Sequence, residues 1–381
     1  MKIAINTRLL ISNKLDGIGW FIYETLKRIT PNHPEIEFYF FFDRPYSEEF
    51  IFSDNIWPVV IHPQARHPVL FYWWFEKQVP KYLEKFNIDF FLSPDGYLSL
   101  STNVPSMAVI HDINFFHRPK DLPLLVRKYY QYYFPRFAKK AKKIATVSQY
   151  SKIDISKNYN VEQEKIDVVY NGANEIFTPI DELEKITVKE KYTNGEDYFI
   201  FVGSLHPRKN LKRLLGAFEL FKKETNSRMK LVIVGEKMFK TNEMKSYYNK
   251  MHYKNDVIWT GRLSPENLKR MLGSALALTF VPVFEGFGIP ILEAMYCDTP
   301  VISANVTSMP EVTSDAALLV DPYSIEEIKN AMLKIVKDEK LRQELINKAR
   351  IQRKKYTWDK TALSLWNSIE DCLADLNSKE S

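Results

Sequence analysis

The sequence has few cysteines and no long apolar segment. Cysteine occupies two of its 381 positions, Cys297 and Cys372, which is too few for a disulfide framework or a cysteine zinc cluster. No uncharged apolar run approaches the roughly 20 residues that a membrane-spanning helix needs. The first six residues are typical of a strand and lack the apolar core of a signal peptide. We therefore expect a protein of a reducing compartment, soluble or attached to one face of a membrane.

Strong charge of one sign is also missing. The net charge is +6 and the isoelectric point is about 8.9, a mild excess of base that suits a phosphorylated ligand or an anionic surface. A dedicated nucleic-acid binder carries stronger and more patterned charge. We therefore expect no nucleic-acid partner.

What the sequence does contain is an alternation of short apolar runs and amphipathic stretches. Runs rich in Val, Ile and Phe, expected to be buried strands, occur at residues 36–42, 88–92, 107–110, 143–147, 166–169, 198–202, 230–234, 257–260, 275–281 and 300–303. Helical segments such as 20–29, 211–223 and 325–336 lie between them. Alternating strands and helices indicate an α/β protein with parallel sheets.

A polar, charged segment divides the chain into two domains. Residues 177–197 include one proline and one glycine and have little strand character, so we interpret them as a linker region. The two expected domains comprise residues 1–176 and 198–356. Residues 357–381 carry apolar side chains at helical spacing and are expected to form a separate final helix.

A pair of glycines follows the first strand region. Gly17 and Gly19 open the helical segment 20–29, where glycine lets the backbone approach a ligand closely and the helix start presents free N–H groups. The dinucleotide fingerprint G-x-G-x-x-G is incomplete, because Ile22 stands where its last glycine would be. The pattern therefore argues against a standard dinucleotide site, and a plain tight turn is the alternative.

Two adjacent cations follow a later strand. Gly203 ends the strand at 198–202, and Arg208 and Lys209 stand just before the next helix. A planar guanidinium and a compact ammonium both suit a diphosphate. Cations at a helix start oppose the helix dipole unless an anion is bound there. We interpret this loop as a phosphate site, and a solvated basic corner is the alternative.

Two glutamates flank a glycine-rich loop that follows another apolar strand. Gly286 and Gly288 permit a tight loop, and Pro290 suits the first turn of a helix. Glu285 and Glu293 are thereby aimed at one pocket from either side of the loop. Carboxylates accept hydrogen bonds from ribose and sugar hydroxyls, while loop N–H groups can hold a diphosphate between them. The alternative is one helix-start charge and one ordinary loop glutamate.

These features together resemble a known family. Glu285 and Glu293 reproduce the E-x7-E signature of the retaining family-four glycosyltransferases of GT-B fold, and residues 207–210 match their phosphate-binding segment. Further matches, in the expected order along almost the whole chain, lie at residues 17–19, 109–112, 146–148, 169–172, 260–263, 308–312 and 315–317. The resemblance implies two Rossmann-like domains facing across a cleft, with the final helix crossing back onto the N-terminal domain.

The resemblance also implies a role for each matched residue. Arg208 and Lys209 would hold the donor diphosphate. Glu293 would bind the nucleotide ribose, and Glu285 the hydroxyls of the transferred sugar. His111 would lie beside the donor sugar, where we favour a positioning role over proton abstraction. The remaining implied donor contacts are Gly17, Gly19, Gly203, Ser204, Arg262, Leu263, Gly286, Phe287, Gly288 and Ile289.

The expected mechanism is electrostatic and needs no metal ion. Many family members carry arginine directly after the glycine equivalent to Gly203, where this chain has Ser204, so Arg208 and Lys209 must supply the clamp. No Asp-x-Asp pair, the usual metal-binding signal of the other main transferase fold, occurs. Side chains and amides would then neutralise the leaving group. The resemblance implies retention by a front-face route, in which the leaving phosphate oxygen helps to deprotonate the acceptor. A covalent intermediate on Glu285 is the alternative.

Two aromatic stretches are candidates for contact with the acceptor or with a membrane. Residues 70–75 contain five aromatic side chains, and residues 128–143 mix six aromatic with six basic ones. Aromatic residues with clustered lysines suit an interfacial helix on anionic lipid, and burial in the core is the alternative. We expect a cytoplasmic protein, peripheral on the cytoplasmic face of the inner membrane.

Within the family, the sequence most resembles bacterial mannosyltransferases of surface-polysaccharide (O-antigen) synthesis. These use GDP-mannose and extend lipid-linked glycans, which predicts transfer of an α-mannosyl unit to a lipid-linked or polysaccharide acceptor. No residue identifies guanine or mannose, so UDP-glucose, UDP-galactose and UDP-N-acetylhexosamine donors stay open. A nucleotide-sugar epimerase and a non-catalytic sugar-nucleotide-binding protein are the rival interpretations.

Overall fold

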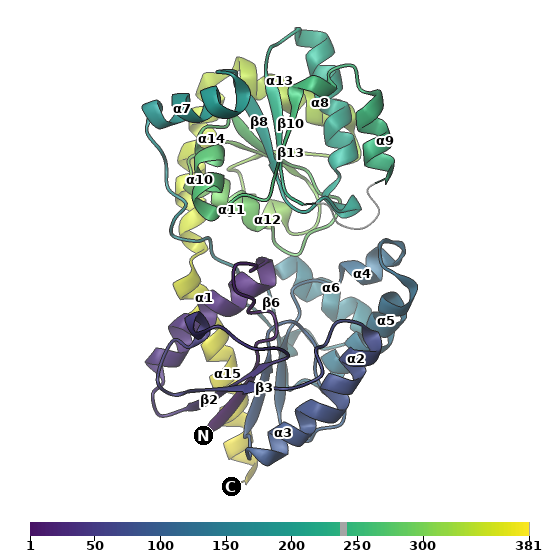
Figure 1. The fold of residues 1–381 in the computed structure, drawn as a ribbon, viewed down its shortest axis with the longest axis vertical. Coiled ribbons are helices and arrows are strands. Elements are labelled where there is room, and N and C mark those ends of the chain that lie inside the picture. The colour runs from purple at the N-terminus through teal and green to yellow at the C-terminus, as the bar shows by residue number, and fades with distance from the viewer. Residues whose placement is uncertain (237–241, 381) are drawn as a thin grey trace. The chain divides into compact units, whose positions relative to one another are not determined.

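The computed structural model describes residues 1–236 and 242–380 and divides into two α/β units (Figure 1). Unit 1 comprises Met1–Asn171 together with Trp358–Ser381, and unit 2 comprises Gly172–Thr357. Each unit contains one sheet whose strand pairings are all parallel. The prediction of two Rossmann-like α/β domains is confirmed.

Unit 1 has a seven-stranded sheet with the order β3-β2-β1-β4-β5-β6-β7. Its strands are β1 (Lys2–Asn6), β2 (Glu37–Phe42), β3 (Ile56–Val60), β4 (Phe90–Ser93), β5 (Ser106–Val109), β6 (Lys143–Thr146) and β7 (Ile166–Val168). Its first helices are α1 (Gly17–Asn32), α2 (Pro68–Trp73), α3 (Val79–Lys85), α4 (Asn114–His117), α5 (Leu124–Lys140) and α6 (Gln149–Tyr159). Apolar clusters bury both faces of the sheet, which explains why its strands are nearly continuous apolar runs.

The final helix, α15 (Trp358–Glu380), belongs to unit 1. It packs against α1, and Trp366 stacks on His33 with the ring centroids 3.7 Å apart. Its side chains that are buried in the same cluster as those of α1 and β1 are Trp358, Ala362, Leu365, Trp366, Ile369 and Cys372. The expected return of the last helix to the N-terminal domain is confirmed.

Unit 2 has a six-stranded sheet with the order β10-β9-β8-β11-β12-β13. Its strands are β8 (Tyr198–Val202), β9 (Lys230–Val234), β10 (Val257–Gly261), β11 (Ala277–Phe280), β12 (Val301–Ala304) and β13 (Leu318–Val320). Its helices are α7 (Glu182–Thr193), α8 (Leu211–Thr225), α9 (Asn242–Lys250), α10 (Pro265–Gly273), α11 (Ile289–Tyr296), α12 (Met309–Thr313), α13 (Ile325–Lys337) and α14 (Glu339–Gln352).

The segment expected to be a linker, residues 177–197, is largely helical. It contains α7, whose Val188 is buried and whose Glu184 forms an ion pair of 2.8 Å with Arg270 of α10. Asp181 caps α7 by accepting a hydrogen bond from the Glu184 amide. The segment therefore packs as part of unit 2.

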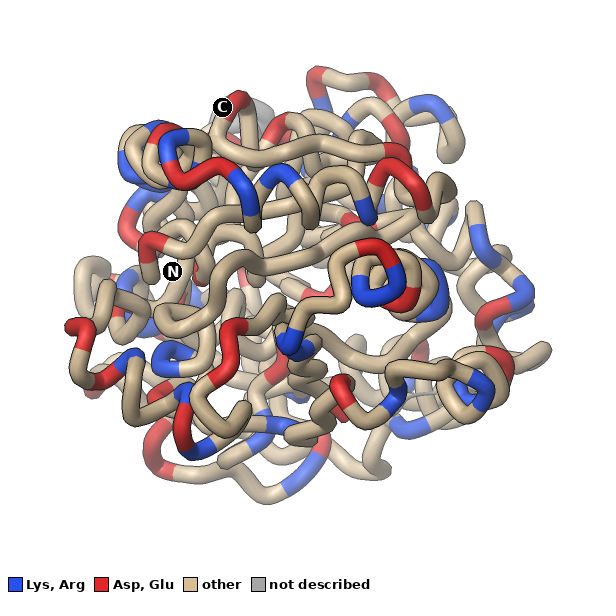
Figure 2. The backbone as a smooth tube through the Cα atoms, turned by 90° about the horizontal axis from the view of Figure 1, so that it is seen from above, with Lys and Arg blue, Asp and Glu red and all other residues tan. Residues whose placement is uncertain are grey.

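Charged residues of both signs are interleaved along the chain. Figure 2 shows Lys and Arg in blue and Asp and Glu in red, both spread over the backbone. This distribution agrees with the mild net charge of the sequence.

Candidate active site

The loops predicted to bind the donor meet at the carboxyl edge of the unit 2 sheet. β8 and β11 are hydrogen-bonded neighbours, and the strand order reverses between them. Open α/β sheets bind ligands at such reversal points, outside the carboxyl ends of the strands. The loop after β8 leads through a short 3₁₀ helix (Pro207–Lys209), and the loop after β11 leads to α11.

Arg208, Lys209 and Glu285 come together at this edge. Nη1 of Arg208 contacts Oε1 of Glu285 and donates to the Phe284 carbonyl at 3.2 Å. Nζ of Lys209 lies 2.5 Å from the same Oε1 and 5.0 Å from the centroid of the Phe280 ring. The side chains of Lys209 and Glu285 are about one-tenth exposed. Two cations thus converge on one carboxylate, and the excess positive charge favours an anion.

The backbone around Glu285 is held by the following loop. Its carbonyl accepts from Oγ of Ser308 at 3.0 Å, and its amide donates to Oγ1 of Thr307 at 3.4 Å. Gly288 is the N-cap of α11 and has a φ of +97°, and a Cβ there would lie 2.9 Å from Cε of Met309. Only glycine fits this position without strain.

Glu293 lies on α11, one turn after Gly288. Within the described part of the chain its carboxylate has no hydrogen-bond partner, and it is only partly exposed. Burial alone raises the pKa of Glu293 to about 7. A half-buried carboxylate of this kind is suited to hydroxyl donors from a ligand.

Asn210 ties the two loops together, a role that the sequence did not reveal. It is buried, adopts a left-handed conformation with a φ of +63°, and precedes α8. Its Nδ2 donates to the carbonyls of Val281 at 2.9 Å and Pro322 at 2.7 Å. The asparagine at the end of the matched segment 207–210 could have indicated a left-handed turn, because asparagine tolerates this backbone conformation better than most residues.

Asn210→Ala is expected to lower the free energy of unfolding by about 2–4 kcal/mol, because two buried carbonyls lose their donor and the backbone conformation becomes unfavourable. The matched control is Asn226→Ala. Asn226 has a φ of +50° but is exposed, and its side chain makes no hydrogen bond in the described structure. Equal losses for both variants in urea denaturation would contradict the role of the Asn210 side chain.

A second residue missed from the sequence is Gly235, after β9. A Cβ on Gly235 would lie 2.0 Å from the carbonyl oxygen of Gly203, whose amide in turn bonds the Val234 carbonyl at 2.9 Å. The backbone after β8 is therefore held against that after β9. Arg262 and Leu263 follow the next strand, β10, at the same edge. The contacts predicted for Ser204, Arg262 and Leu263 with a donor stay predictions.

In unit 1, Gly17 and Gly19 lie in the first turn of α1, as expected. The amide of Gly19, however, donates to Oδ1 of Asp16 at 2.9 Å, because Asp16 is the N-cap of this helix. The expectation of free N–H groups at this helix start is wrong for Gly19. Its contact with a diphosphate stays a prediction, and that contact would have to compete with a carboxylate.

His111 follows β5 at the carboxyl edge of the unit 1 sheet. Its Nε2 lies 2.9 Å from the Pro94 carbonyl, and its ring meets that of Phe21 edge to face at 5.0 Å. Burial lowers the pKa of His111, with partial compensation by the Pro94 hydrogen bond and by Asp112 and other carboxylates. The imidazole is therefore neutral at pH 7.

The predicted aromatic stretches divide between core and surface. Of residues 70–75, Phe71, Trp74 and Phe75 are buried, and in 128–143 Tyr129, Phe134 and Phe137 are buried. For these six, the core alternative is correct.

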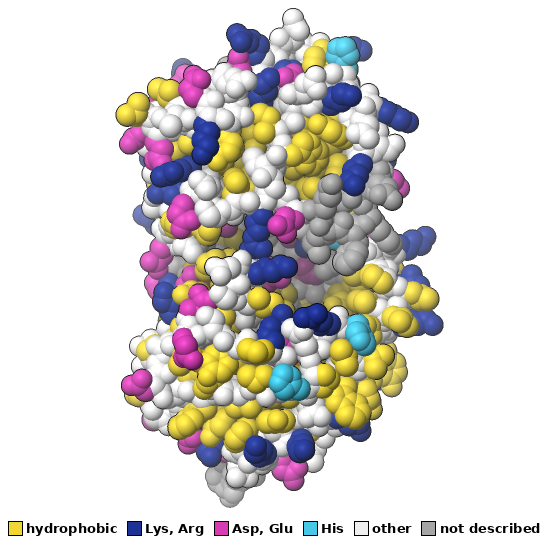
Figure 3. All heavy atoms as spheres, viewed as in Figure 1, with side chains coloured by type: hydrophobic (Ala, Val, Ile, Leu, Met, Phe, Trp, Pro, Cys, Tyr) yellow, Lys and Arg dark blue, Asp and Glu magenta, His cyan; other side chains and the backbone are white. Residues whose placement is uncertain are grey.

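The exposed large apolar side chains of α2, α4 and α5 are Val69, Tyr72, Trp73, Phe116, Leu124, Leu125 and Tyr132, which we call the aromatic patch. Apolar side chains gather over these helices in Figure 3, with basic ones beside them.

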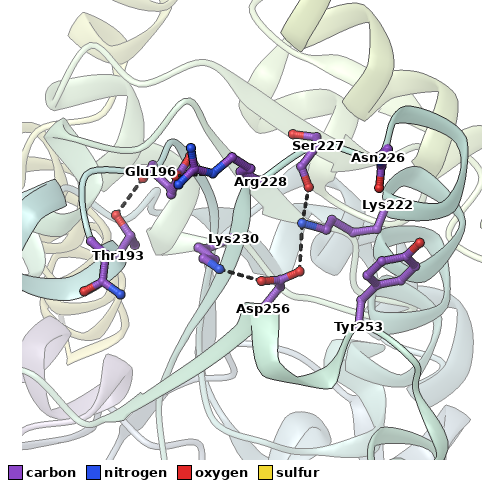
Figure 4. Close-up of a pocket in the computed structure, with 10 residues that line it drawn as sticks. Thr193, Glu196, Lys222, Asn226, Ser227, Arg228, Lys230, Tyr253 and Asp256 are labelled. Atoms are coloured by element: carbon purple, nitrogen blue, oxygen red, sulfur yellow. Dashed lines mark hydrogen bonds and ion pairs between the residues drawn. The ribbon is translucent and has the colours of Figure 1, made fainter.

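A separate polar pocket of about 330 Å³ lies at the opposite, amino edge of the unit 2 sheet (Figure 4). Nζ of Lys222 contacts Asp256 at 2.8 Å and donates to the carbonyls of Ser227 and Met229, which follow the end of α8. Lys230 contacts Asp256 at 2.5 Å. These cations are already paired with a partly buried carboxylate and with the carbonyls that follow α8, so we assign the pocket no ligand.

Metal-ligand and membrane-spanning features are both missing from the described residues. No three His, Cys, Asp or Glu side chains gather there as a metal site would require. None of the helices described combines the length and the apolar content needed to cross a bilayer.

Comparisons with known proteins agree with this geometry. The model of the family "Glycosyltransferase Family 4" matches residues 15–175, and that of "Glycosyl transferases group 1" matches residues 183–352. O-antigen chain mannosyltransferase B of Escherichia coli is 28% identical over 266 residues, which cover 70% of each chain. O-antigen chain mannosyltransferase RfbU of Salmonella typhimurium is 32% identical over 226 residues, or 59% of each chain.

A solved structure shows the same fold along nearly the whole chain. The structure of Anabaena Alr3699/HepE in complex with UDP and glucose superposes with a TM-score of 0.75, covering 97% of this chain and 99% of that one at 14% identity. The chain therefore belongs to the GT-B glycosyltransferases, with a family 4 domain followed by a group 1 domain, and is homologous to the O-antigen mannosyltransferases.

Proposed function

We propose that the protein is a retaining, metal-independent hexosyltransferase that moves an α-mannosyl unit from GDP-mannose to a lipid-linked or polysaccharide glycan. The observation that carries this proposal is the convergence of Arg208 and Lys209 on Glu285 at the reversal point of the unit 2 sheet. The choice of mannose is supported by the names of the Escherichia coli and Salmonella relatives.

The cluster supports an exchange of partners when the donor binds. The diphosphate replaces Glu285 as the partner of Arg208 and Lys209, since it carries more charge and accepts more hydrogen bonds. Glu285 is then released to accept hydrogen bonds from hydroxyls of the transferred sugar, while Glu293 takes those of the ribose. The two cations stay in place to stabilise the charge that develops on the leaving diphosphate.

Donor identity is tested by thermal unfolding with GDP-mannose, UDP-glucose, UDP-galactose and UDP-N-acetylglucosamine. A ligand at 100 times its Kd stabilises the folded state by about 2.7 kcal/mol, so the true donor raises Tm by several degrees. A shift with a UDP-sugar alone would favour the UDP-dependent alternative, which the UDP complex of the Anabaena neighbour also supports. No shift with any of these four sugars contradicts donor binding.

The reaction class is tested by product release. A transferase frees nucleoside diphosphate only when a glycan acceptor is present, whereas an epimerase converts the sugar without releasing it. We expect release to need acceptor and to persist in EDTA. Loss of activity in EDTA that added Mg²⁺ or Mn²⁺ restores would contradict the metal-independent mechanism.

We also propose that the aromatic patch lies on an anionic membrane surface, where a lipid-linked acceptor would be met. Residues 117–143 contain nine Lys and Arg against one Asp, and Lys128, Arg136, Lys139, Lys140 and Lys142 are exposed. Exposed apolar side chains beside clustered basic ones suit the headgroup region of such a membrane.

Binding to vesicles of 30% phosphatidylglycerol and 70% phosphatidylcholine is expected to weaken at high salt. The double variant Trp73→Glu, Leu125→Glu should lower binding at least 10-fold, because each apolar side chain contributes about 1.5–3 kcal/mol when buried. The control is Leu183→Glu, at an exposed apolar position of α7 in unit 2. Binding of the wild type, the double variant and the control is measured by vesicle co-sedimentation. Equal binding by the double variant and the wild type would contradict the proposal.

A further inference from the structure

Arg8 is a buried cation at the carboxyl edge of the unit 1 sheet. It follows β1, its side chain is 8% exposed, and its guanidinium lies 4.5 Å from the centroid of the Tyr97 ring. Its Nε donates to Oδ2 of Asp95, which follows β4, at 2.7 Å. The strand order of this sheet reverses between β1 and β4. The pair therefore occupies in unit 1 the position that ligand-binding loops occupy in open α/β sheets.

The Asp95 carboxylate fixes the turn in which it stands. Besides Arg8, it accepts hydrogen bonds from Nδ2 of Asn6 at 2.8 Å, Oγ of Ser93 at 3.2 Å and the amide of Tyr97 at 3.3 Å. A buried ion pair is weak evidence for stability, because desolvation of both charges offsets their attraction. Its clearer effect here is to hold the backbone of residues 93–97 in one conformation.

That turn presents the Pro94 carbonyl to His111. The distance from Nε2 of His111 to this oxygen is 2.9 Å. A carbonyl can only accept, so Nε2 carries the proton of the neutral ring and Nδ1 keeps its lone pair. The edge-to-face contact with Phe21 of α1 restrains the ring plane from the other side.

We infer that Arg8 is a positioning residue for His111. Through Asp95 and the Pro94 carbonyl, Arg8 keeps the imidazole of His111 neutral, with Nδ1 as the acceptor for a substrate hydroxyl. This inference rests on the proposed function for the identity of that hydroxyl, which belongs to the sugar donor or its acceptor. The state of the imidazole can be measured without either substrate.

The charges around His111 determine whether its pKa rises or falls when the charge of Arg8 is removed. Three carboxylates act on the ring and favour its protonated form: Asp16 of the α1 cap, Asp112 of its own loop, and Asp95. Asp16 and Asp112 bond the amides of Gly19 and Asn114, whereas the partner of Asp95 is the cationic Arg8. Removing the Arg8 charge leaves Asp95 uncompensated, so the pKa of His111 should rise.

The test is an NMR titration of the imidazole Cε1–H signals in the full-length protein, with His111 assigned by its absence in His111→Gln. We expect a pKa below 6.5 in the wild type, as the desolvated ring implies. Arg8→Gln should raise the pKa by about one unit, and Arg8→Lys should leave it close to that of the wild type. Arg8→Gln combined with Asp95→Asn should restore it.

A wild-type titration curve in Arg8→Gln would overturn the inference. If Arg8→Gln fails to fold, Asp95→Asn is titrated instead. Loss of this carboxylate should lower the pKa of His111 further. An unchanged pKa in Asp95→Asn would overturn the inference. The acid limb of the kcat–pH profile should move with the pKa in each variant. A His111→Gln variant that transfers sugar at the wild-type rate would contradict the role of His111 in transfer, while the titration would still report on Arg8.

Discussion

Glu293→Gln is expected to give a protein that is more stable without ligand and binds its donor at least 10-fold more weakly. The wild-type carboxylate is partly buried without a hydrogen-bond partner, and burial raises its pKa to about 7. A neutral amide avoids the cost of burying this charge, so the free energy of unfolding should rise by about 1–3 kcal/mol at pH 8. Donor affinity falls because a carboxylate accepts hydroxyl hydrogen bonds more strongly than an amide does.

The gain in stability should depend on pH in a defined direction. The pKa of Glu293 is higher in the folded protein than its unfolded value of 4.5. Ionisation therefore favours the unfolded state as pH rises from about 4.5 to 7, and the wild type loses stability over this window. The Tm of Glu293→Gln should exceed that of the wild type by a few degrees at pH 8 and by less at pH 5.

The matched control for this substitution is Glu266→Gln. Glu266 also lies near the start of a helix, α10, but it is exposed and its backbone and Ser264 hydrogen bonds lower its pKa. We expect neither a gain in stability nor a change in donor binding. If Glu293→Gln bound GDP-mannose or UDP-sugars as tightly as the wild type in calorimetry, the role of Glu293 in ribose binding would be wrong.

Lys209→Met should lower kcat by a factor of about 10²–10³ while the protein stays folded. The ammonium group is expected to stabilise the charge that develops on the leaving diphosphate, and loss of one preorganised donor costs enzymes about this factor. Methionine keeps an apolar stem but loses the ammonium nitrogen that lies 5.0 Å from the centroid of the Phe280 ring. Arg208 remains as a partner for Glu285, so the carboxylate is not left buried alone.

Lys212→Met serves as the control, because Lys212 lies in the first turn of α8, its side chain is 53% exposed, and its ammonium pairs with the exposed Glu243. Steady-state transfer rates and Tm values should be measured for both variants. A wild-type rate in Lys209→Met would show that Lys209 does not stabilise the leaving diphosphate. Similar losses in both variants would point to a general effect of surface charge.

The sequence was sufficient for the fold wherever apolar runs were long and uninterrupted. β2 and β8 are buried along almost their whole length, and both were predicted from residue type alone. β3 (Ile56–Val60) was missed because Pro58 interrupts its pattern. Proline is tolerated there because β3 is the edge strand of its sheet. β13, which is three residues long, was missed as well.

The site could be predicted in part, because motif residues mark loops but not the contacts between them. The sequence placed Arg208 and Lys209 on one loop and Glu285 on another, and it assigned them to different parts of the donor. It gave no sign that they bind one another, which depends on β8 and β11 being neighbours in the sheet. Asn210 and Gly235 were missed for the same reason: their partners lie on loops far away along the chain.

The membership of α15 in unit 1 has a consequence for how the chain reaches its native state. Unit 2 is encoded without interruption, so all of it is synthesised before the last segment of unit 1. Until then, the apolar surface of α1 that Trp358, Leu365 and Trp366 cover stays open to water and to chaperones. A nascent chain that stops short of residue 358 should therefore be a target for quality control even though most of its strands are complete.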